Sequence, residues 1–355
     1  MTFSRTLFAA LVCIAAAGAV DDALAAQRHF VASTGSDSNP CSIALPCRSF
    51  AAAALLVDPN GEILVHDTAG YGFVAITKSL SIISPSGVYA GISVFAAQDG
   101  ITVNVPGGNV RLAGLWINGQ GGGTGILVQQ AARVTVEGCS VTNMAADGFG
   151  NAAASARIVI RNSVFRENAG AGITSAAAAE MTIDAVHADS NGGSGIALAG
   201  TKASISNSVS NDNGANGITL TASTGVQTTV AISDHKSSDN AGSGIDASHT
   251  GAGVVYATVS RSALSGNGQH GGHVLAGGQG QSRLIVADSQ VAGNAVSGIT
   301  AENLSALAVI HGNTITNNPV GVQGLATGLV HSIGNNSIRE NTTNTGTGYA
   351  TYAGA

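Results

Sequence analysis

The sequence predicts an all-β solenoid of short stacked strands behind an N-terminal cap, and three observations predict it. An internal repeat of 22 to 27 residues runs through most of the chain. Stretches such as "RIVIRNSVF" and "RLIVADSQV" alternate apolar and polar residues with period two, which is typical of strands and not of helical repeats. An asparagine and a Gly-Ile pair recur at fixed places in the repeat, which indicates one supersecondary unit per coil.

The repeat keeps one register over eight units. The string Asn-x-x-x-Gly-Ile occurs five times, and an apolar strand residue stands eight positions before each asparagine. The strand residues of the eight units are Ile160, Ile183, Ile205, Ile232, Val259, Val286, Val309 and Ile333. The asparagines are Asn168, Asn191, Asn213, Asn240, Asn267, Asn294, Asn317 and Asn341. We expect their amides to hydrogen-bond from coil to coil as an internal ladder, since stacked amides stabilise stacked strands.

The repeat unit "IVIRNSVFRENAGAGI" resembles the right-handed parallel β-helix repeat of pectate-lyase-like proteins. The resemblance covers residues 133–346 at least and extends back to about Ile63. It implies a right-handed solenoid, but it does not imply one activity. That superfamily contains polysaccharide lyases, hydrolases and epimerases, phage tailspikes, adhesins and members without a known role. The segment "VASTGSDSNPCSIALPCRSFAAA" is similar to the opening segment of exported β-helix proteins.

The chain divides into four expected parts. Residues 1–25 read as a signal peptide, with Arg5, an apolar run over 7–20 and a small-residue cleavage site at 23–25. Residues 26–62 form the expected capping segment, with a short helix over 49–57. The β-helix follows over 63–346, and a polar tail occupies 347–355. We therefore expect a secreted protein, extracellular, periplasmic or on the cell surface, with no membrane span once the signal is removed.

The cysteines predict one small disulfide. Cys41 and Cys47 lie six residues apart, which in an exported protein indicates a disulfide loop more than a metal site. Zinc would need two further Cys or His ligands nearby, and the sequence supplies none at short spacing. Cys139 falls beside a strand of the repeat, where we expect a buried free thiol.

Composition argues against nucleic acid as a partner and against a cofactor. Charged residues make up 10% of the chain and the net charge is −6, with no stripe of Lys and Arg. The string "GNGQHG" at 266–271 spells a dinucleotide motif but lacks the surrounding βαβ unit. His270 and His273 are interpreted as solvated histidines of a glycine-rich turn, because two ligands make no metal site. We expect no metal and no cofactor.

One charged patch stands out on the predicted solvent side of the strands. Three residues before the strand residue, four successive coils carry Arg133, Arg157, Glu180 and Lys202, and one residue after it three coils carry Glu137, Arg161 and Asp184. The alternating signs predict a ladder of cross-strand ion pairs on an exposed sheet. The alternative is a groove in which the cations neutralise the carboxylates of a bound polymer.

A second column contains Asp234, Arg261, Asp288 and His311. Asp234 and Asp288 would lie two coils apart with an arginine between them, which does not favour a pair of catalytic carboxylates. The sequence thus predicts a secreted or surface protein that binds a polysaccharide or another extracellular polymer, without an evident catalytic site. The alternatives are a polysaccharide lyase or glycoside hydrolase acting on a uronic-acid polymer and, after these, a structural role in the envelope. The sequence does not specify an oligomeric state.

Overall fold

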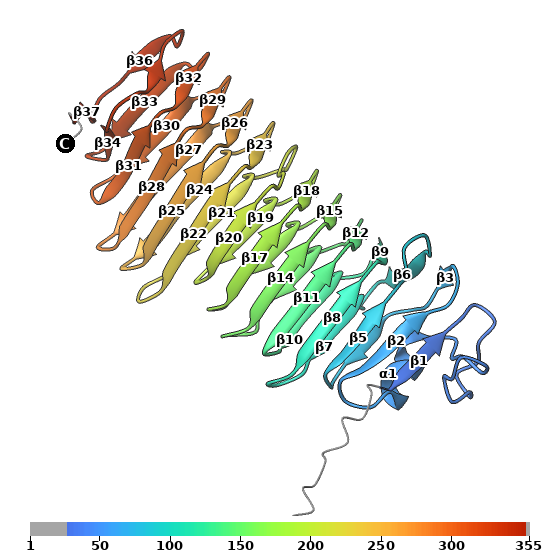
Figure 1. The fold of residues 1–355 in the computed structure, drawn as a ribbon. Coiled ribbons are helices and arrows are strands. Elements are labelled where there is room, and N and C mark those ends of the chain that lie inside the picture. Colours follow the sequence, from blue (N-terminus) through green and yellow to red (C-terminus); the bar gives the residue numbers. More distant parts are fainter. Residues whose placement is uncertain (1–26, 353–355) are drawn as a thin grey trace, which may run out of the picture.

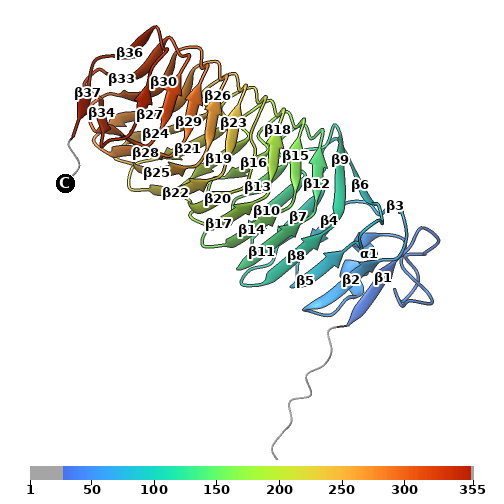
Figure 2. The same ribbon diagram turned by 45° about the horizontal axis from the view of Figure 1, so that its top comes forward.

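The computed structural model describes residues 27–352, whose strands stack coil upon coil into an elongated parallel β-helix (Figure 1). Every coil has three sides. The first side is a sheet of 14 strands, the second a sheet of 12 strands, and the third consists of sheets of six and five strands. Val209 forms bridges to both His187 and Lys236 and so connects the two parts of the third side. Figure 2 shows the short strands of this third side in line along the solenoid.

The 14-stranded sheet contains β1 (Arg28–Val31), β2 (Gly61–Val65), β5 (Leu80–Ile83), β8 (Asn109–Ala113), β11 (Arg133–Glu137), β14 (Arg157–Arg161), β17 (Glu180–Asp184), β20 (Lys202–Ser206), β22 (Gln227–Ser233), β25 (Val254–Ser260), β28 (Gln281–Ala287), β31 (Ala306–His311), β34 (Leu329–Ser332) and β37 (Tyr349–Thr351). The 12-stranded sheet contains β4 (Val74–Ile76), β7 (Ile101–Asn104), β10 (Ile126–Gln130), β13 (Phe149–Asn151), β16 (Ile173–Ser175), β19 (Ile196–Ala199), β21 (Ile218–Ala222), β24 (Ile245–Gly251), β27 (His270–Gly278), β30 (Ser297–Glu302), β33 (Val320–Leu325) and β36 (Thr343–Thr345). The third side contains β3 (Ala69–Gly70), β6 (Ala90–Phe95), β9 (Leu115–Gln120), β12 (Ser140–Thr142), β15 (Val164–Arg166) and β18 (His187–Asp189), followed by β23 (Lys236–Ser238), β26 (Ala263–Ser265), β29 (Gln290–Ala292), β32 (Thr314–Thr316) and β35 (Ser337–Ile338).

The hydrophobic core fills the inside of the coil. In β14, Ile158 and Ile160 are completely buried, whereas Arg157 and Arg161 are exposed. The same alternation runs through the neighbouring strands, because successive side chains of a strand point to opposite faces. The predicted parallel β-helix is confirmed, including the inward and outward assignment of these residues.

An asparagine ladder runs inside the bend that leads into the 12-stranded sheet. The Nδ2 of each ladder asparagine donates to the Oδ1 of the next, at 2.9 to 3.1 Å. Its members are Asn168, Asn191, Asn213, Asn240, Asn267, Asn294, Asn318 and Asn341. Met144 occupies the preceding place, where its backbone N–H donates to Asn168 Oδ1 at 3.1 Å.

The sequence assignment of Asn317 to this ladder is wrong by one residue. In every coil of the ladder the residue before the asparagine has a left-handed backbone, with φ between 54° and 67°. Asn317 takes that position, at φ 55°, and Asn318 supplies the ladder amide. Asparagine tolerates this conformation better than most residues, so either of two adjacent asparagines fits the motif by spelling.

The strand frame of the last two coils shifts with it. Ile310 and not Val309 pairs with the core residue Val286, and Ser332 then pairs with Ile310. Ile333, the predicted strand residue, follows β34 and is 44% exposed. Ile310 stands eight residues before Asn318, so this coil keeps the spacing of the earlier coils, whereas the last coil has one residue more between Ser332 and Asn341.

A second ladder, which the sequence analysis did not identify, follows the bend between the first and third sides. Backbone N–H groups donate to Ser262 Oγ, Ser289 Oγ and Asn313 Oδ1 in successive coils, at 3.0 to 3.2 Å. Cys139 lies in the same column and is a buried free thiol, as predicted, and its burial raises its pKa to about 11.

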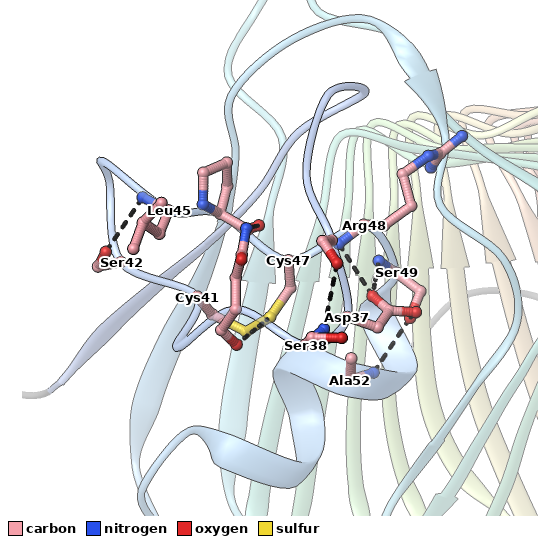
Figure 3. Close-up of a disulfide and its surroundings, with 12 residues drawn as sticks. Asp37, Ser38, Cys41, Ser42, Leu45, Cys47, Arg48, Ser49 and Ala52 are labelled. Atoms are coloured by element: carbon pink, nitrogen blue, oxygen red, sulfur yellow. Dashed lines mark hydrogen bonds between the residues drawn. A yellow bond between two sulfur atoms is a disulfide. The ribbon is translucent and has the colours of Figure 1, made fainter.

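The N-terminal segment closes the first coil. Cys41 and Cys47 form the predicted disulfide, and Phe30 in β1 exchanges backbone hydrogen bonds with both cysteines at 2.7 and 2.9 Å. The Asp37 carboxylate accepts the backbone N–H groups of Arg48 and Ser49 at 2.9 and 2.8 Å (Figure 3). This anchors Ser49, the N-cap of helix α1 (Phe50–Leu56), which lies within the range predicted for a helix. The free edge of β1 is therefore covered.

The far end of the solenoid extends into the predicted tail. Tyr349–Thr351 forms β37, the last strand of the 14-stranded sheet. The predicted signal peptide over 1–25 lies outside the described residues. Within residues 27–352 no helix has the length and apolar character needed to cross a bilayer.

Candidate functional site

A group of acidic and imidazole side chains lies on the outer face of the 12-stranded sheet. Asp246 in β24, His273 in β27 and Thr300 in β30 are register partners in three adjacent strands. Their neighbours Ile245 and Ala247 are completely buried, so Asp246 points outward. We call Asp246, His270, His273 and Glu302 the imidazole–carboxylate cluster.

His273 is the centre of the cluster. Its Nδ1 lies 2.7 Å from Asp246 Oδ1, and its Nε2 lies 3.4 Å from Glu302 Oε2. The His273 side chain is only 12% exposed, against 17% for Asp246 and 40% for Glu302. Burial acts to lower the pKa of His273, but the hydrogen bond and charge of Asp246, helped by Glu302, outweigh it and raise the pKa above its ordinary value.

His270 stacks on His273 but has the opposite tendency. The two ring centroids are 4.9 Å apart with planes inclined by 22°. His270 Nδ1 lies 2.8 Å from Ser297 Oγ, and Ser297 Oγ lies 2.5 Å from Thr300 Oγ1. Burial, followed by the charge of His273, lowers the pKa of His270 to about 4. At neutral pH His270 is therefore uncharged, whereas His273 keeps its proton to a higher pH than an ordinary histidine does.

This arrangement corrects two points of the sequence analysis. His270 and His273 are partly buried residues of β27, and not solvated side chains of a turn. A convergent set of acid and base groups exists, although the sequence analysis found none. The sequence held a signal for it: His273 follows Asp246 by 27 residues, and Ser297 follows His270 by 27 residues, which is the local coil length. Asp246 and Glu302 were not predicted, because successive coils were aligned only at the strands of the 14-stranded sheet.

The cluster does not have the form of a metal site. Across the described residues, no group of three His, Cys, Asp or Glu side chains is arranged to hold a metal ion. The two nitrogens of His273 are directed at carboxylates, which fixes the ring in place. A ring held in this way between carboxylates can bind and move protons.

The predicted charged patch lies on the outer face of the 14-stranded sheet. The register is as expected: Arg133, Arg157, Glu180 and Lys202 are successive partners, and so are Glu137, Arg161 and Asp184. The expected ion pairs are not formed: among the described residues, none within 4.0 Å joins Arg157 to Glu180 or Arg161 to Asp184. Glu137 pairs instead with Arg111 of the preceding coil, at 3.0 Å.

Shorter polar side chains compete successfully for the carboxylates. Asp184 Oδ1 accepts from Ser206 Oγ at 2.7 Å and from Asn207 Nδ2 at 2.9 Å. These hydrogen bonds, more than the charge of Arg161, lower the pKa of Asp184. Holding a long exposed arginine in one rotamer costs entropy that an exposed ion pair hardly offsets. In the second column Arg261 does pair with Asp234, at 2.9 and 2.7 Å.

A shallow depression of about 700 Å³ begins at one end of the charged patch. It is lined by Ser155, Ala178, Ala179, Glu180, Gly200, Lys202, Gln227 and Thr229. Glu180 and Lys202 are its only charged lining residues, and neither Arg157 nor Arg161 lines it. The depression is wide enough for part of a polymer, but it does not bring an acid and a base together as the imidazole–carboxylate cluster does.

Comparison with known proteins identifies the fold. A family model described as the right handed beta helix region matches residues 99–258, whereas no curated protein sequence matches the chain. The A-module of mannuronan C-5 epimerase AlgE4 of Azotobacter vinelandii is 16% identical, with a TM-score of 0.61 over 83% of this chain and 89% of that module. The A-module of the epimerase AlgE6 of the same organism is also 16% identical, with a TM-score of 0.50 over 83% and 87%. The Agl-KA catalytic domain is 15% identical, with a TM-score of 0.50 over 82% and 61%.

Proposed function

Because this chain folds as a right-handed parallel β-helix, we propose that it is secreted and binds a polysaccharide along the outer face of its 12-stranded sheet. The observation that carries the proposal is the convergence of Asp246, His273 and Glu302 on that face. A buried or half-buried cluster of charged groups on an otherwise charge-poor surface costs folding free energy, which function accounts for. The long stacked face suits a repetitive polymer.

The distribution of charge favours a neutral polysaccharide on this face. Among the described strands, the 12-stranded sheet contains no Lys or Arg. The strands of the 14-stranded sheet contain Arg28, Arg111, Arg133, Arg157, Arg161, Lys202 and Arg283. A uronic-acid polymer at the cluster would bring carboxylates beside Asp246 and Glu302 with only His273 to compensate, which is electrostatically unfavourable. A neutral glycan would meet donors and acceptors without that repulsion.

A second candidate function is cleavage of the bound polymer. The observation that favours it is the pair of stacked imidazoles whose pKa values are shifted in opposite directions. When His273 is protonated it can donate a proton to a leaving glycosidic oxygen, and the uncharged His270 can accept one from the attacking water. Asp246 would hold the His273 ring in position. Glu302 would accept the hydrogen bond from His273 Nε2 until a substrate oxygen replaces the Glu302 carboxylate as acceptor.

The test measures binding and turnover with two neutral polymers, laminarin and dextran, and two uronic-acid polymers, alginate and polygalacturonate. Binding is followed by calorimetry, and turnover by reducing ends and by the absorbance of unsaturated products. We expect a neutral polymer to bind, and His273→Ala and Asp246→Asn to weaken binding about tenfold, which corresponds to about 1.4 kcal/mol. Turnover accompanied by loss in the same variants supports the second candidate.

The matched control is His311→Ala, because His311 also faces a carboxylate, Asp288, at 3.9 Å, but lies in the 14-stranded sheet. It should leave binding unchanged. Unchanged binding in folded His273→Ala and Asp246→Asn proteins would contradict the proposal. A preference for uronic-acid polymers that disappears in Arg157→Ala and Arg161→Ala would move the site to the 14-stranded sheet.

A further inference from the structure

Two exposed aromatic rings on the third side of the coil have no role in the proposed site. Trp116 in β9 is the only tryptophan of the chain and is 50% exposed, and Tyr89 just before β6 is 45% exposed. Their ring centroids lie 5.9 Å apart, with planes inclined by 47°. Aromatics make up 4% of the chain, and several of the larger ones, such as Phe149 and Phe165, are buried in the core. Leaving a tryptophan half in water forgoes a large hydrophobic gain.

Gly91 makes room for the pair. It is the register partner of Trp116, so the two residues lie side by side in the six-stranded sheet. A Cβ at Gly91 would lie 2.6 Å from Tyr89 Cε1 and 2.9 Å from its hydroxyl. The glycine is therefore needed to let the Tyr89 ring lie on the sheet next to Trp116. The Tyr89 backbone N–H donates to Thr68 Oγ1 at 3.2 Å, which holds the start of this segment.

Polar side chains surround the aromatic pair. Ser140 is the next register partner of Trp116, and Asn118 follows Trp116 on the same face. Asn118 Oδ1 accepts from Asn143 Nδ2 at 3.0 Å, which orients its amide. The surface is thus a small apolar plate with hydrogen-bonding groups at its side. It lacks the broad apolar core that a stable contact with a second protein requires, about 800 Å² on each partner.

A second aromatic side chain lies further along the same strand face. Gly91, Ser93 and Phe95 alternate with buried residues of β6, and Phe95 is 59% exposed. At a rise of about 3.3 Å per residue, Phe95 lies roughly 13 Å from Gly91. A ligand that spans both aromatic positions is longer than one ring. A chain of linked rings with apolar and polar faces meets this requirement.

We propose that Tyr89 and Trp116 form a platform on which a pyranose ring of a polysaccharide stacks, with Asn118 and Ser140 beside its hydroxyls. The C–H face of a pyranose is apolar while its rim carries hydroxyls, which matches an aromatic plate with a polar border. The identity of the ligand rests on the proposed function. The location is independent of it, because five coils separate β9 from β24, about 24 Å along the solenoid at about 4.8 Å per coil.

The single tryptophan makes the test specific to this surface. The full chain is titrated with laminarihexaose, cellohexaose and hexagalacturonate while the emission of Trp116 and its quenching by acrylamide are recorded. We expect at least one hexasaccharide to change the emission saturably and to protect Trp116 from the quencher. Tyr89→Ala should weaken this binding at least about fivefold while Trp116 still reports it.

Two further variants separate stacking from general disturbance. Gly91→Ala keeps both aromatic side chains but displaces the Tyr89 ring, so it should also lower the affinity. The matched control is Tyr352→Ala, which removes another exposed tyrosine, in contact with His331 at 4.6 Å between ring centroids. That control should leave the titration unchanged. Circular dichroism and thermal unfolding establish that each variant is folded.

Other outcomes would overturn the platform. One is a Trp116 emission and quenching that no hexasaccharide alters at saturating concentration. Another is a dimer in sedimentation that becomes a monomer in Trp116→Ala, since the aromatic pair would then be a contact between copies. His273→Ala distinguishes the two proposals: it should weaken polymer binding at the imidazole–carboxylate cluster about tenfold, as measured by calorimetry, and leave the Trp116 titration intact. A saturable response of Trp116, together with calorimetric polymer binding that His273→Ala leaves unchanged, would retain the platform and reject the proposed site.

Discussion

His270 and His273 illustrate how the surroundings of one residue set its chemistry. They are three positions apart in one strand, yet their pKa values move in opposite directions. His273 lies between two carboxylates, whereas His270 faces the hydroxyl of Ser297 and the positive ring of His273. Burial alone acts on both rings in the same sense. The carboxylate partners of His273 therefore decide the difference.

The opposite shifts predict a window of pH for the cluster. His270 becomes protonated as the pH falls through about 4, so its capacity to accept a proton is lost there. His273 loses its proton as the pH rises through its raised pKa, so its positive charge and capacity to donate are lost on the alkaline side. We expect polymer binding or turnover to fall on both sides. Asp246→Asn should move the alkaline limb to lower pH, as measured by affinity across pH 3 to 9.

The sign of the stability change follows from the same shifts. Because the pKa of His273 is higher in the folded protein than in the unfolded chain, His273 contributes its full stabilisation below its unfolded pKa. That contribution is lost as the pH rises through its folded pKa. The lowered pKa of His270 destabilises the fold as the pH falls. Between its pKa in the unfolded chain and about 4, the unfolded chain binds the proton more readily than the folded protein does. Thermal unfolding across the same pH range measures both. An alkaline limb that does not move in Asp246→Asn would contradict the assignment to His273.

At the scale of the element, the bend with the asparagine ladder joins each coil to the next. Each ladder asparagine from Asn168 to Asn318 donates through Nδ2 to one neighbour and accepts the backbone N–H of another, and its side chain is buried. Such a buried amide cannot turn to water if its partner is removed. The bend therefore depends on the asparagines of both neighbouring coils.

Replacing Asn240 by leucine should destabilise the protein by about 1 to 3 kcal/mol for each partner left without a hydrogen bond. The Asn213 Nδ2 and backbone N–H lose their acceptor, which is Asn240 Oδ1. Denaturant unfolding measures the change. The control is Asn109→Leu, an exposed asparagine of β8, which should alter stability by less than about 0.5 kcal/mol. Equal stability of the two variants would count against the ladder as a stabilising element.

In the exposed strands of the 14-stranded sheet, the backbone register does not decide which side chains interact. Their backbone register places Arg157 beside Glu180, but the side chains do not form an ion pair. On the same sheet Arg261 and Asp234 do, with two contacts. The order of charges along a stack sets which groups can meet. Local rotamers, competing hydroxyls and amides set which of them do.

At the scale of the whole molecule, an open solenoid must protect its first strand. The Cys41–Cys47 loop bonds along β1, and Phe50 of α1 packs against Tyr71, with ring centroids 5.2 Å apart. Without this cover, β1 would present an unpaired edge that can pair with another copy. The cap therefore stabilises the end of the solenoid and limits association.

Removal of the disulfide by Cys41→Ser with Cys47→Ser should cost about 2 kcal/mol, because the loop it closes is short. We also expect the variant to associate at micromolar concentration through the uncovered edge of β1. Thermal unfolding and light scattering measure the two effects. The control is Ser42→Ala, which removes only the contact of the Ser42 hydroxyl with the Leu45 N–H at 3.2 Å in the same loop. A variant without the disulfide that melts like this control and stays monomeric would refute the role of the loop.

The sequence by itself determined the parallel solenoid, the inward and outward faces of its strands, and the disulfide. These features repeat within one coil or lie close in sequence, so period-two alternation and short spacing are enough to predict them. Ile158 and Ile160 are buried because alternate residues of a strand point into the core. Cys47 is the partner that lies within reach of Cys41. The local coil length of 27 residues also places His273 over Asp246.

Only the tertiary structure decided which side chains of different coils meet. One extra or missing residue in a bend moves the frame of a whole coil, which is why Asn318 and not Asn317 joins the ladder. A side chain that reaches several neighbours takes the partner with the best geometry, as Asp184 does with Ser206 and Asn207 in place of Arg161. The same selection joins Asp246, His273 and Glu302 across three strands, because stacking at about 4.8 Å brings residues far apart in sequence within hydrogen-bonding distance.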